Sequence, residues 1–203
     1  FFFVEFGMHR LKTVLRHIGT RGVSTFKAGY FEKTADGPQF SVRELQLSDL
    51  PQEAVLVQID YSTLNYKDAL AITNAGPIIK TFPMVGGVDY AGTVMESDDP
   101  DLKVGDKVVM NGWGAGETHW GGYSQFMRTK AAHLLPLPPR FSTYEAMAIG
   151  TAGYTAMLCI LKLVDHGVTP AHGPVLVTGA TGGVGSFAVA MLSSMGYRTL
   201  ACT

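Results

Sequence analysis

Cysteine is scarce in this chain of 203 residues, which holds only Cys159 and Cys202. Two cysteines can form at most one bridge, and these two do not stand at the short spacing of a cysteine-based metal site. A disulfide framework is therefore excluded, and a reducing, intracellular compartment is the simplest interpretation. Uninterrupted apolar runs of about 18 or more residues are also missing, so we expect no membrane span.

An excess of charge of one sign is missing as well. The chain has 16 basic and 17 acidic residues, for a net charge of −1. Because binding to a phosphate backbone needs clustered positive charge, we expect no nucleic-acid partner. With 46% hydrophobic and 16% charged residues, the composition is that of a globular protein and is too apolar for a disordered one.

The first residues lack both an initial methionine and acidic side chains between Met8 and Lys27. The same stretch has five basic residues, and its apolar side chains fall on one helical face. It resembles a mitochondrial presequence, but we favour a disordered extension or translated sequence upstream of the real start. We set residues 1–23 apart as an extension or presequence. The predicted location is cytoplasmic, or mitochondrial if residues 8–24 are a presequence.

The part from residue 24 to residue 142 has the pattern of many short strands separated by turns. We expect a short helix over residues 65–72 and a glycine-rich loop over residues 112–122, which carries Trp113, His119 and Trp120. The strands are expected over residues 26–33, 40–44, 54–61, 85–96, 107–110 and 123–129. This pattern predicts a β-barrel-like domain, with a bulge or close packing at the glycines of the 85–96 strand.

Residues 143–203 have a different pattern, that of alternating helix and strand. An Ala-rich helix over 143–163, broken near 150–153, precedes a strand over 175–178, a glycine loop, a helix over 186–195 and a strand beginning at Arg198. This is the first half of a βαβ unit, so the fold class is α/β plus β. A doubly wound nucleotide-binding sheet has about six strands. We therefore expect this domain, and the chain, to be truncated at the C-terminal end.

The glycine loop runs from Gly179 to Gly185 and stands between a strand and a helix. Free N–H groups and the positive end of the helix dipole favour a phosphate there, and glycines allow its close approach. Ala180 replaces the first glycine of the G-x-G-x-x-G pattern, and no Lys-Ser or Lys-Thr follows, which excludes a P-loop. A glycine-rich packing turn without a ligand is the alternative.

Several ordered motifs together resemble the medium-chain dehydrogenase/reductase superfamily, and within it the acrylyl-CoA reductase (YhdH/AcuI-type quinone oxidoreductase) family. The resemblance covers residues 24–203 and implies a GroES-like barrel followed by a Rossmann domain. The motifs are Leu64-Asn65-Tyr66-Lys67-Asp68, the runs at 85–94, 105–108 and 112–114, the run from Gly150 to Ala156, and the loop at 177–185.

The resemblance also bears on metal binding. Zinc members of the superfamily have a Cys and a Gly-His-Glu run as ligands, where this chain reads Asn65-Tyr66-Lys67-Asp68 and Gly87-Val88-Asp89. No histidine stands at ligand spacing with a cysteine, and a zinc site needs three or four ligands. We expect no metal.

The function that the resemblance implies is the NADPH-dependent, zinc-independent reduction of acryloyl-CoA to propanoyl-CoA. Tyr66 and Asn65 are the expected catalytic residues. The expected cofactor-binding residues are Tyr66, Thr181, Gly182, Gly183, Val184 and Thr203. NADPH is the implied cofactor, and a small acyl-CoA or enone is the implied substrate.

Other interpretations remain open. The complete protein could be a general quinone or enone reductase, or an NADPH-binding protein without turnover. Tyr66 could be a core tyrosine and Asn65 a helix N-cap, while Lys67 and Asp68 could pair or lie solvated. We expect His119 to form a hydrogen bond within its loop. The complete protein is expected to be a homodimer, and this fragment alone to be inactive.

Overall fold

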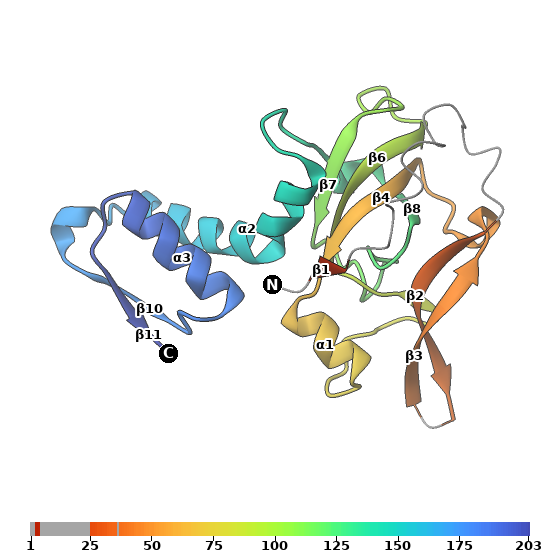
Figure 1. Ribbon diagram of the computed structural model, residues 1–203, viewed down its shortest axis with the longest axis horizontal. Helices are drawn as coiled ribbons and strands as arrows, with labels where there is room; N and C mark the ends of the chain where they lie inside the picture. Colours follow the sequence, from red (N-terminus) through yellow and green to blue (C-terminus); the bar gives the residue numbers. More distant parts are fainter. Residues whose placement is uncertain (1–2, 5–24, 36) are drawn as a thin grey trace. The chain divides into compact units, whose positions relative to one another are not determined.

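The computed structural model describes residues 3–4, 25–35 and 37–203 (Figure 1). The predicted presequence over residues 8–24 lies outside the described residues. The chain divides into two compact units, an N-terminal unit that ends at Ala148 and a C-terminal unit that runs from Ile149 to Thr203. This division falls inside the helix α2 (Thr143–Asp165), whereas the sequence-based boundary is the first residue of that helix.

The N-terminal unit consists mainly of short strands, as its sequence predicts. They are β1 (Phe3–Val4), β2 (Phe26–Thr34), β3 (Gly37–Leu45), β4 (Val55–Thr63), β5 (Met84–Val85), β6 (Asp89–Ser97), β7 (Lys107–Asn111), β8 (Phe126–Thr129) and β9 (Leu135–Pro136). One helix, α1 (Tyr66–Ile72), follows directly after β4. Short 3-10 turns lie at Leu47–Asp49 and Ala131–His133.

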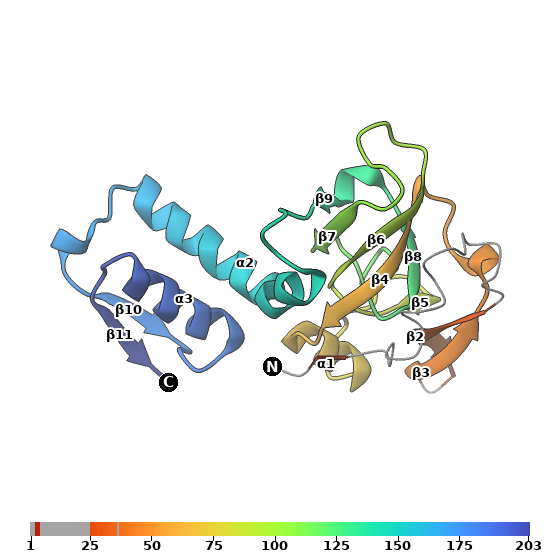
Figure 2. The same cartoon turned by 45° about the horizontal axis from the view of Figure 1, so that its top comes forward.

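The strands of this unit form two described sheets that share a connecting segment. One sheet has the order β1-β4-β6-β7-β9 with β8 also paired to β4, and the other has the order β3-β2-β5. Residues 121–125 hydrogen-bond to both sheets: the Gly29 N–H donates to the Tyr123 carbonyl, and the Ile59 N–H donates to the Gln125 carbonyl. Figure 2 shows β4, β6 and β7 curving side by side. The arrangement is the predicted barrel-like one.

The core of the N-terminal unit explains which strands lie at its centre. Val55, Leu56 and Val57 of β4 are all fully buried, so this strand is covered on both faces. They join Tyr90 and Val94 of β6 in one apolar cluster. Burial of this apolar surface is the main stabilising contribution of the unit, at roughly 25 cal/mol per Å² removed from water.

The single strand predicted over residues 85–96 is wrong, because the structure has two strands there. β5 pairs with β2, and β6 pairs with β4 and β7. Gly87 lies between them at φ +95, and a Cβ at this position would be 2.7 Å from the backbone nitrogen of Tyr123. The glycine thus allows the chain to leave one sheet and enter the other.

The C-terminal unit combines helices with a short parallel sheet. β10 (Val175–Thr178) pairs in parallel with β11 (Thr199–Cys202), and α3 (Gly183–Ser194) connects them. α3 begins three residues earlier than the predicted Ser186, because Gly182 is its extended N-cap residue and Gly183 its first helical one. Ile160 of α2, Leu192 of α3 and Tyr197 form the buried cluster.

The long helix α2 is interrupted, as the sequence predicts. Gly150 has the non-helical angles φ 52 and ψ −163 inside the span Thr143–Asp165. By length and composition alone this helix could cross a membrane, and 28% of its most apolar window is buried. Core helices of other proteins meet the same criterion, so the observation by itself assigns no membrane role.

Candidate functional site

The first turn of α1 presents one of the predicted catalytic residues to the surface. Asn65 holds the N-cap position with extended backbone angles, as the N-cap alternative predicted. Tyr66, the first helical residue, has an exposed fraction of 81%, so the alternative of a core tyrosine is wrong. Its aromatic ring and hydroxyl are thus available for contact with a ligand.

Asp68 lies beneath this turn and is almost completely buried, with an exposed fraction of 4%. Its Oδ2 accepts a hydrogen bond of 2.8 Å from the backbone N–H of Asn65. The carboxylate therefore caps one of the free N–H groups at the helix start. The prediction that Asp68 pairs with Lys67 or lies solvated is wrong: Lys67 forms an ion pair with Glu117 at 2.7 Å instead.

A second buried carboxylate, Asp89 at the start of β6, fixes the side chain of Asn65. Asp89 Oδ1 accepts hydrogen bonds from the Thr63 hydroxyl at 2.6 Å and the Thr63 N–H at 3.2 Å. The Asn65 amide nitrogen donates to Thr63 Oγ1 at 2.9 Å and approaches Asp89 Oδ2 at 3.4 Å. Asn65 is therefore held by the last residue of β4 and the first residue of β6.

Tyr123 completes this buried polar network. Its hydroxyl donates to the Thr63 carbonyl at 3.1 Å. Burial raises the pKa of the Tyr123 hydroxyl, and the nearby charge of Asp68 raises it further. The phenol is consequently held in its protonated form and acts as a hydrogen-bond donor.

The electrostatics of the network give Asp68 an unusual protonation range. Burial raises the pKa of the Asp68 carboxyl from 3.8 to about 6, and the charge of Asp89 adds to this effect. Hydrogen bonds from the Asn65 N–H and from Tyr123 oppose the rise. A carboxyl with a pKa near neutrality can hold or release a proton under physiological conditions.

Asp68, Asp89 and Tyr123 are members of this network that the sequence interpretation did not select. A usable signal existed for Asp68, because an acidic residue three positions after a helix N-cap residue is a capping pattern. Asp89 and Tyr123 are distant in sequence from Asn65, so only the pairing of the strands brings them close. The sequence prediction for His119 is confirmed, since its Nδ1 lies 3.0 Å from the Thr118 hydroxyl.

The predicted cofactor loop lies in the C-terminal unit between β10 and α3. Thr181, Gly182, Gly183 and Val184 are all exposed. α3 begins at Gly183 without a side-chain cap hydrogen bond. The N–H groups of the first turn and the helix dipole are therefore available to an anionic group.

Gly185 shows why this loop needs glycine. A Cβ at this position would be 2.1 Å from the carbonyl oxygen of Gly179. Gly179 itself has φ +60, in the left-handed region that glycine adopts without strain. The two residues let the start of α3 come close to the end of β10, which is the packing that a dinucleotide-binding turn requires.

Thr203 directly follows β11, at the same sheet edge as this loop. Thr178 of β10 and Cys202 of β11 are paired, and both strands run in the same direction. The Ala180 N–H donates to the Cys202 carbonyl at 3.0 Å. The loop and Thr203 thus lie together at the carboxyl edge of the sheet, the edge at which open α/β sheets bind their ligands.

The structure therefore groups the predicted site residues by unit. Asn65 and Tyr66 are neighbours in the N-terminal unit, while the residues 181–184 and Thr203 share one edge of the C-terminal unit. Their catalytic and cofactor-binding roles stay predictions. Within residues 25–35 and 37–203, no group of three or more His, Cys, Asp or Glu side chains is arranged to hold a metal ion, and the prediction of a metal-free site stays a prediction.

Comparison with known proteins gives close relatives. Residues 51–139 match the family described as "Alcohol dehydrogenase GroES-like domain". The chain is 54% identical over 165 residues to acrylyl-CoA reductase AcuI of Ruegeria pomeroyi, covering 81% of this chain and 50% of that protein. It is 43% identical over 178 residues to the putative quinone oxidoreductase YhfP of Bacillus subtilis, covering 88% of this chain and 54% of that protein.

Solved structures agree with this relationship. Escherichia coli YhdH with bound NADPH is 49% identical, with a TM-score of 0.83 over 86% of this chain and 54% of that one. The chain spans about half the length of the curated relatives it matches. These relatives are bacterial and give the mitochondrial alternative no support. The fold, the ordered motifs and the identities place the chain in the acrylyl-CoA reductase (YhdH/AcuI-type quinone oxidoreductase) family of the medium-chain dehydrogenase/reductase superfamily.

Proposed function

We propose that the full-length protein containing this chain uses NADPH to reduce the activated C=C bond of an enoyl thioester, with acryloyl-CoA as substrate and propanoyl-CoA as product. The observation that carries the proposal is the 54% identity, over most of this chain, to a protein named acrylyl-CoA reductase. Solved relatives bound to NADPH and to NADP add support for the cofactor.

The residues of the C-terminal unit fit a dinucleotide. The uncapped start of α3 offers N–H groups and a favourable dipole to a pyrophosphate, and the loop residues 181–184 beside it are exposed. Thr203, at the same sheet edge, would donate its hydroxyl to the phosphate on the ribose.

When bound, NADPH supplies the hydride that reaches the β-carbon of the substrate. Negative charge then develops on the thioester oxygen until the α-carbon takes a proton from solvent. Positioned hydrogen-bond donors stabilise such a charge. We assign this role to the exposed Tyr66 hydroxyl. Asn65, which is held by Thr63 and Asp89, would position the first turn of α1 and with it Tyr66.

We also propose that the reaction needs no zinc. The side chains at the places of the zinc ligands are used otherwise: Asp89 accepts hydrogen bonds from Thr63, and Asn65 is bound to the same threonine. Elemental analysis of the purified, active full-length protein tests this point. Activity that falls on chelation and returns with zinc would contradict it.

The reaction is tested by following NADPH oxidation by the full-length protein with acryloyl-CoA, with NADH in a parallel series. We expect turnover that requires both NADPH and the enoyl thioester. A protein that turns over acryloyl-CoA with NADH alone would contradict the cofactor assignment. The relative from Bacillus subtilis has a solved structure with NAD bound, which makes this comparison informative.

The role of Tyr66 is tested by Tyr66→Phe, with Tyr154→Phe as the matched control at an exposed tyrosine of the C-terminal unit. Loss of one transition-state donor lowers kcat by about a hundredfold. We expect that decrease for Tyr66→Phe, with little change in the affinity for NADPH, and no change for Tyr154→Phe. Equal activity of the two variants would remove Tyr66 from the chemistry.

A quinone reductase is the second candidate function, because the relative from Bacillus subtilis is named a putative quinone oxidoreductase. The same assay with a benzoquinone in place of the thioester separates the two. Turnover of the quinone alone would replace the leading proposal. Binding of NADPH without turnover of either acceptor would favour a noncatalytic protein.

A homodimer, proposed from the resemblance alone, is tested by the mass of the full-length protein in solution.

A further inference from the structure

A pocket on the N-terminal unit gathers basic side chains that the proposed reaction does not use. It has a volume of about 180 Å³. Its walls come from the segment before β4, the loop at 118–120, and the end of β8 with the 3-10 turn that follows. The charged and titratable residues that line it are Glu53, His119, Arg128, Lys130 and His133.

The net charge of the pocket depends on the protonation of its two histidines. Arg128 is partly neutralised by an ion pair with Glu96. Lys130 is exposed, and Glu53 is the one acidic side chain among the lining residues. With both histidines neutral, the charges of Arg128 and Lys130 are matched by those of Glu96 and Glu53. Protonation of either histidine gives the pocket a positive surplus, which favours an anion over a neutral ligand.

The two imidazoles are held in defined positions. The rings of His119 and His133 are perpendicular, with centroids 5.4 Å apart. Trp113 stacks on His133 at 5.0 Å with an angle of 14° between the planes. Nδ1 of His119 lies 3.0 Å from the Thr118 hydroxyl, and Nδ1 of His133 lies 3.5 Å from the Thr129 hydroxyl. Nε2 of each ring is therefore the nitrogen that can donate to a ligand.

The pKa of His133 is set first by burial and then by its charged neighbours. Burial lowers the pKa of His133, and the neighbouring His119 and Lys130 lower it further, while Glu53 raises it. An anion bound among these groups would offset the positive charges of His119 and Lys130. It would therefore raise the pKa of His133.

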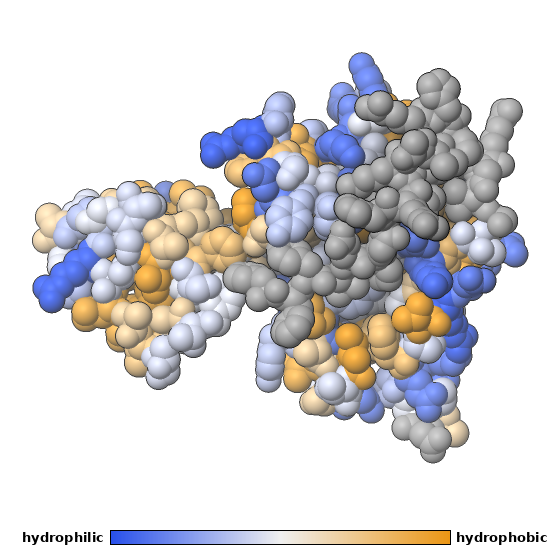
Figure 3. Space-filling view, in the orientation of Figure 1, coloured by the Kyte–Doolittle hydropathy of each residue, from blue (hydrophilic) through white to orange (hydrophobic). Residues whose placement is uncertain are grey.

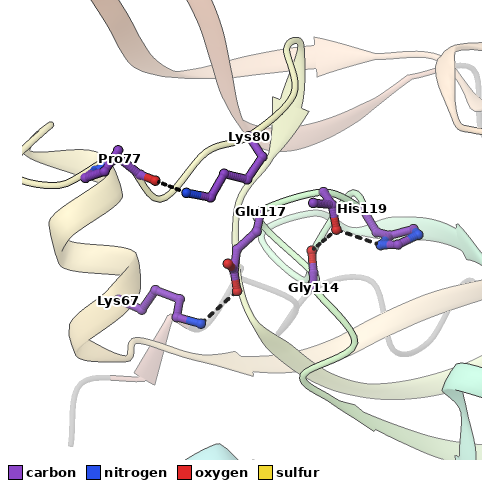
Figure 4. Close-up of polar contacts among 7 residues, drawn as sticks. Lys67, Pro77, Lys80, Gly114, Glu117 and His119 are labelled. Atoms are coloured by element: carbon purple, nitrogen blue, oxygen red, sulfur yellow. Dashed lines mark hydrogen bonds and ion pairs between the residues drawn. The ribbon is translucent and has the colours of Figure 1, made fainter.

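The pocket is separate from the network around Asn65. Figure 4 shows Glu117 reaching toward Lys67 of α1, while the ring of His119 extends to the other side of the same loop. Neither Asn65, Tyr66, Asp68, Asp89 nor Tyr123 lines the pocket. The pocket is therefore lined by other residues than those to which we assign the chemistry.

We propose that this pocket binds a phosphate-type oxyanion, either free phosphate or a phosphate group carried by a larger molecule. Charge-assisted hydrogen bonds to oxyanions come from Arg, Lys and protonated His, which are the side chains gathered here. The Thr118 and Thr129 hydroxyls lie in the same wall and contact the two imidazoles.

The proposal is tested by observing the imidazole signals of His119 and His133 by NMR in the full-length protein. The titrants are inorganic phosphate, sulfate and adenosine 3′,5′-bisphosphate, with chloride at equal ionic strength as reference. These signals are local, so an anion at the start of α3 does not mimic the effect. We expect saturable shifts with the three oxyanions. If the bisphosphate binds more strongly than inorganic phosphate, the natural ligand is a phosphate group on a larger molecule. If the two bind equally, it is free phosphate.

Two substitutions locate the site, and a third is the control. Lys130→Ala and His133→Gln each remove one charged donor, so each should weaken binding by about tenfold. Lys103→Ala removes an exposed lysine elsewhere on the unit and should leave binding unchanged. Shifts that are no larger than with chloride, or equal weakening by all three substitutions, would overturn the proposal.

The pH dependence gives an independent readout. Sulfate keeps its charge between pH 5 and 8, so changes in its affinity report on the protein. Its affinity should be highest when both histidines are protonated and should decrease as the pH rises through the pKa of His133 in the complex. In sulfate, that pKa should be higher than in chloride. An unchanged pKa would overturn the proposal.

Discussion

The two units of the chain bury their apolar side chains to very different extents. In the N-terminal unit, Val55, Leu56, Val57 and Tyr90 are completely buried in one cluster. In the C-terminal unit, the buried cluster of Ile160, Leu192 and Tyr197 is small. Its surface carries exposed apolar side chains, which include Leu158 and Leu161 of α2, Leu176 of β10 and Leu200 of β11. Orange and pale orange areas cover much of this unit in Figure 3.

The difference follows from the kind of sheet in each unit. Antiparallel strands that curve into a barrel cover one another, and the connecting segment at 121–125 joins the two sheets of the N-terminal unit. Parallel strands such as β10 and β11 occur almost only in sheets with both faces covered. A parallel pair with exposed Leu176 and Leu200 is therefore incomplete as an independent fold.

The largest effect that tests this comparison is the behaviour of the two parts when they are separated. We expect residues 25–148 to unfold cooperatively, and residues 143–203 alone to be unstable or to aggregate. A unit of about 60 residues with a small core is at the limit of independent stability. Circular dichroism during thermal unfolding measures the behaviour of both fragments.

A matched variant sharpens the same experiment. Leu176→Lys and Leu200→Lys should reduce aggregation of the 143–203 fragment if its exposed apolar side chains are the cause. Cooperative unfolding of the unaltered fragment, with native-like helix and strand signals, would contradict the prediction.

The next largest effect concerns the turn before α3. Gly185→Ala would place a methyl group 2.1 Å from the Gly179 carbonyl oxygen. Relieving this contact moves the backbone of the turn, and restoring the original turn costs about 3 kcal/mol. Because NADPH needs the undistorted turn, that cost falls on binding, and the affinity for NADPH should fall by about a hundredfold. Gly76→Ala in the N-terminal unit is the control, since the nearest atoms to its methyl group would be those of Leu70 at 3.8 Å, an ordinary contact. Titration of NADPH fluorescence with each full-length variant measures the two affinities. Equal affinities of the two variants for NADPH would contradict the prediction.

A smaller effect is expected from the buried carboxyl of the N-terminal unit. Because the pKa of Asp68 is raised in the folded protein to about 6 from 3.8, the folded state binds more protons than the unfolded state between these values. The free energy of unfolding should therefore decrease as the pH rises from about 4 to 6, by about 2 kcal/mol from this group. Urea unfolding at the two pH values measures the change.

Asp68→Asn should abolish that pH dependence, because the amide does not titrate. The control is Asp49→Asn. The Asp49 carboxylate also accepts a hydrogen bond from the backbone N–H three residues earlier, that of Gln46, at 2.7 Å, but it lies in an exposed turn. It should leave the pH dependence unchanged. The same pH profile in Asp68→Asn and the unaltered protein would show that Asp68 is not its source.

The smallest effect belongs to the ion pair between Lys67 and Glu117, whose side chains are 49% and 25% exposed. Such a pair stabilises by less than about 1 kcal/mol. Glu117→Gln should therefore lower the urea midpoint slightly, and the difference should vanish in high salt because screening removes the attraction. A salt-independent loss would mean that Glu117 acts through packing rather than through its charge.

The sequence predicts those parts of this structure that depend on local patterns. The glycine loop, its flanking strand and helix, and the break in α2 are all local, and each occurs near its predicted place. At Gly87 the chain passes from the sheet that contains β5 to the sheet that contains β6. This break depends on the close approach of Tyr123, which is distant in sequence. The burial of Asp68 escaped prediction for the same reason, since β6 and Tyr123 enclose it.

The break at Gly150 has a practical consequence for anyone who wishes to recombine members of this family. The boundary between the units lies beside a residue with φ 52, in a helix that is otherwise continuous from Thr143 to Asp165. Most other residues would be strained there by about 1 kcal/mol or more. A chimera that joins the barrel of one relative to the nucleotide-binding part of another should therefore be spliced so that this glycine is kept.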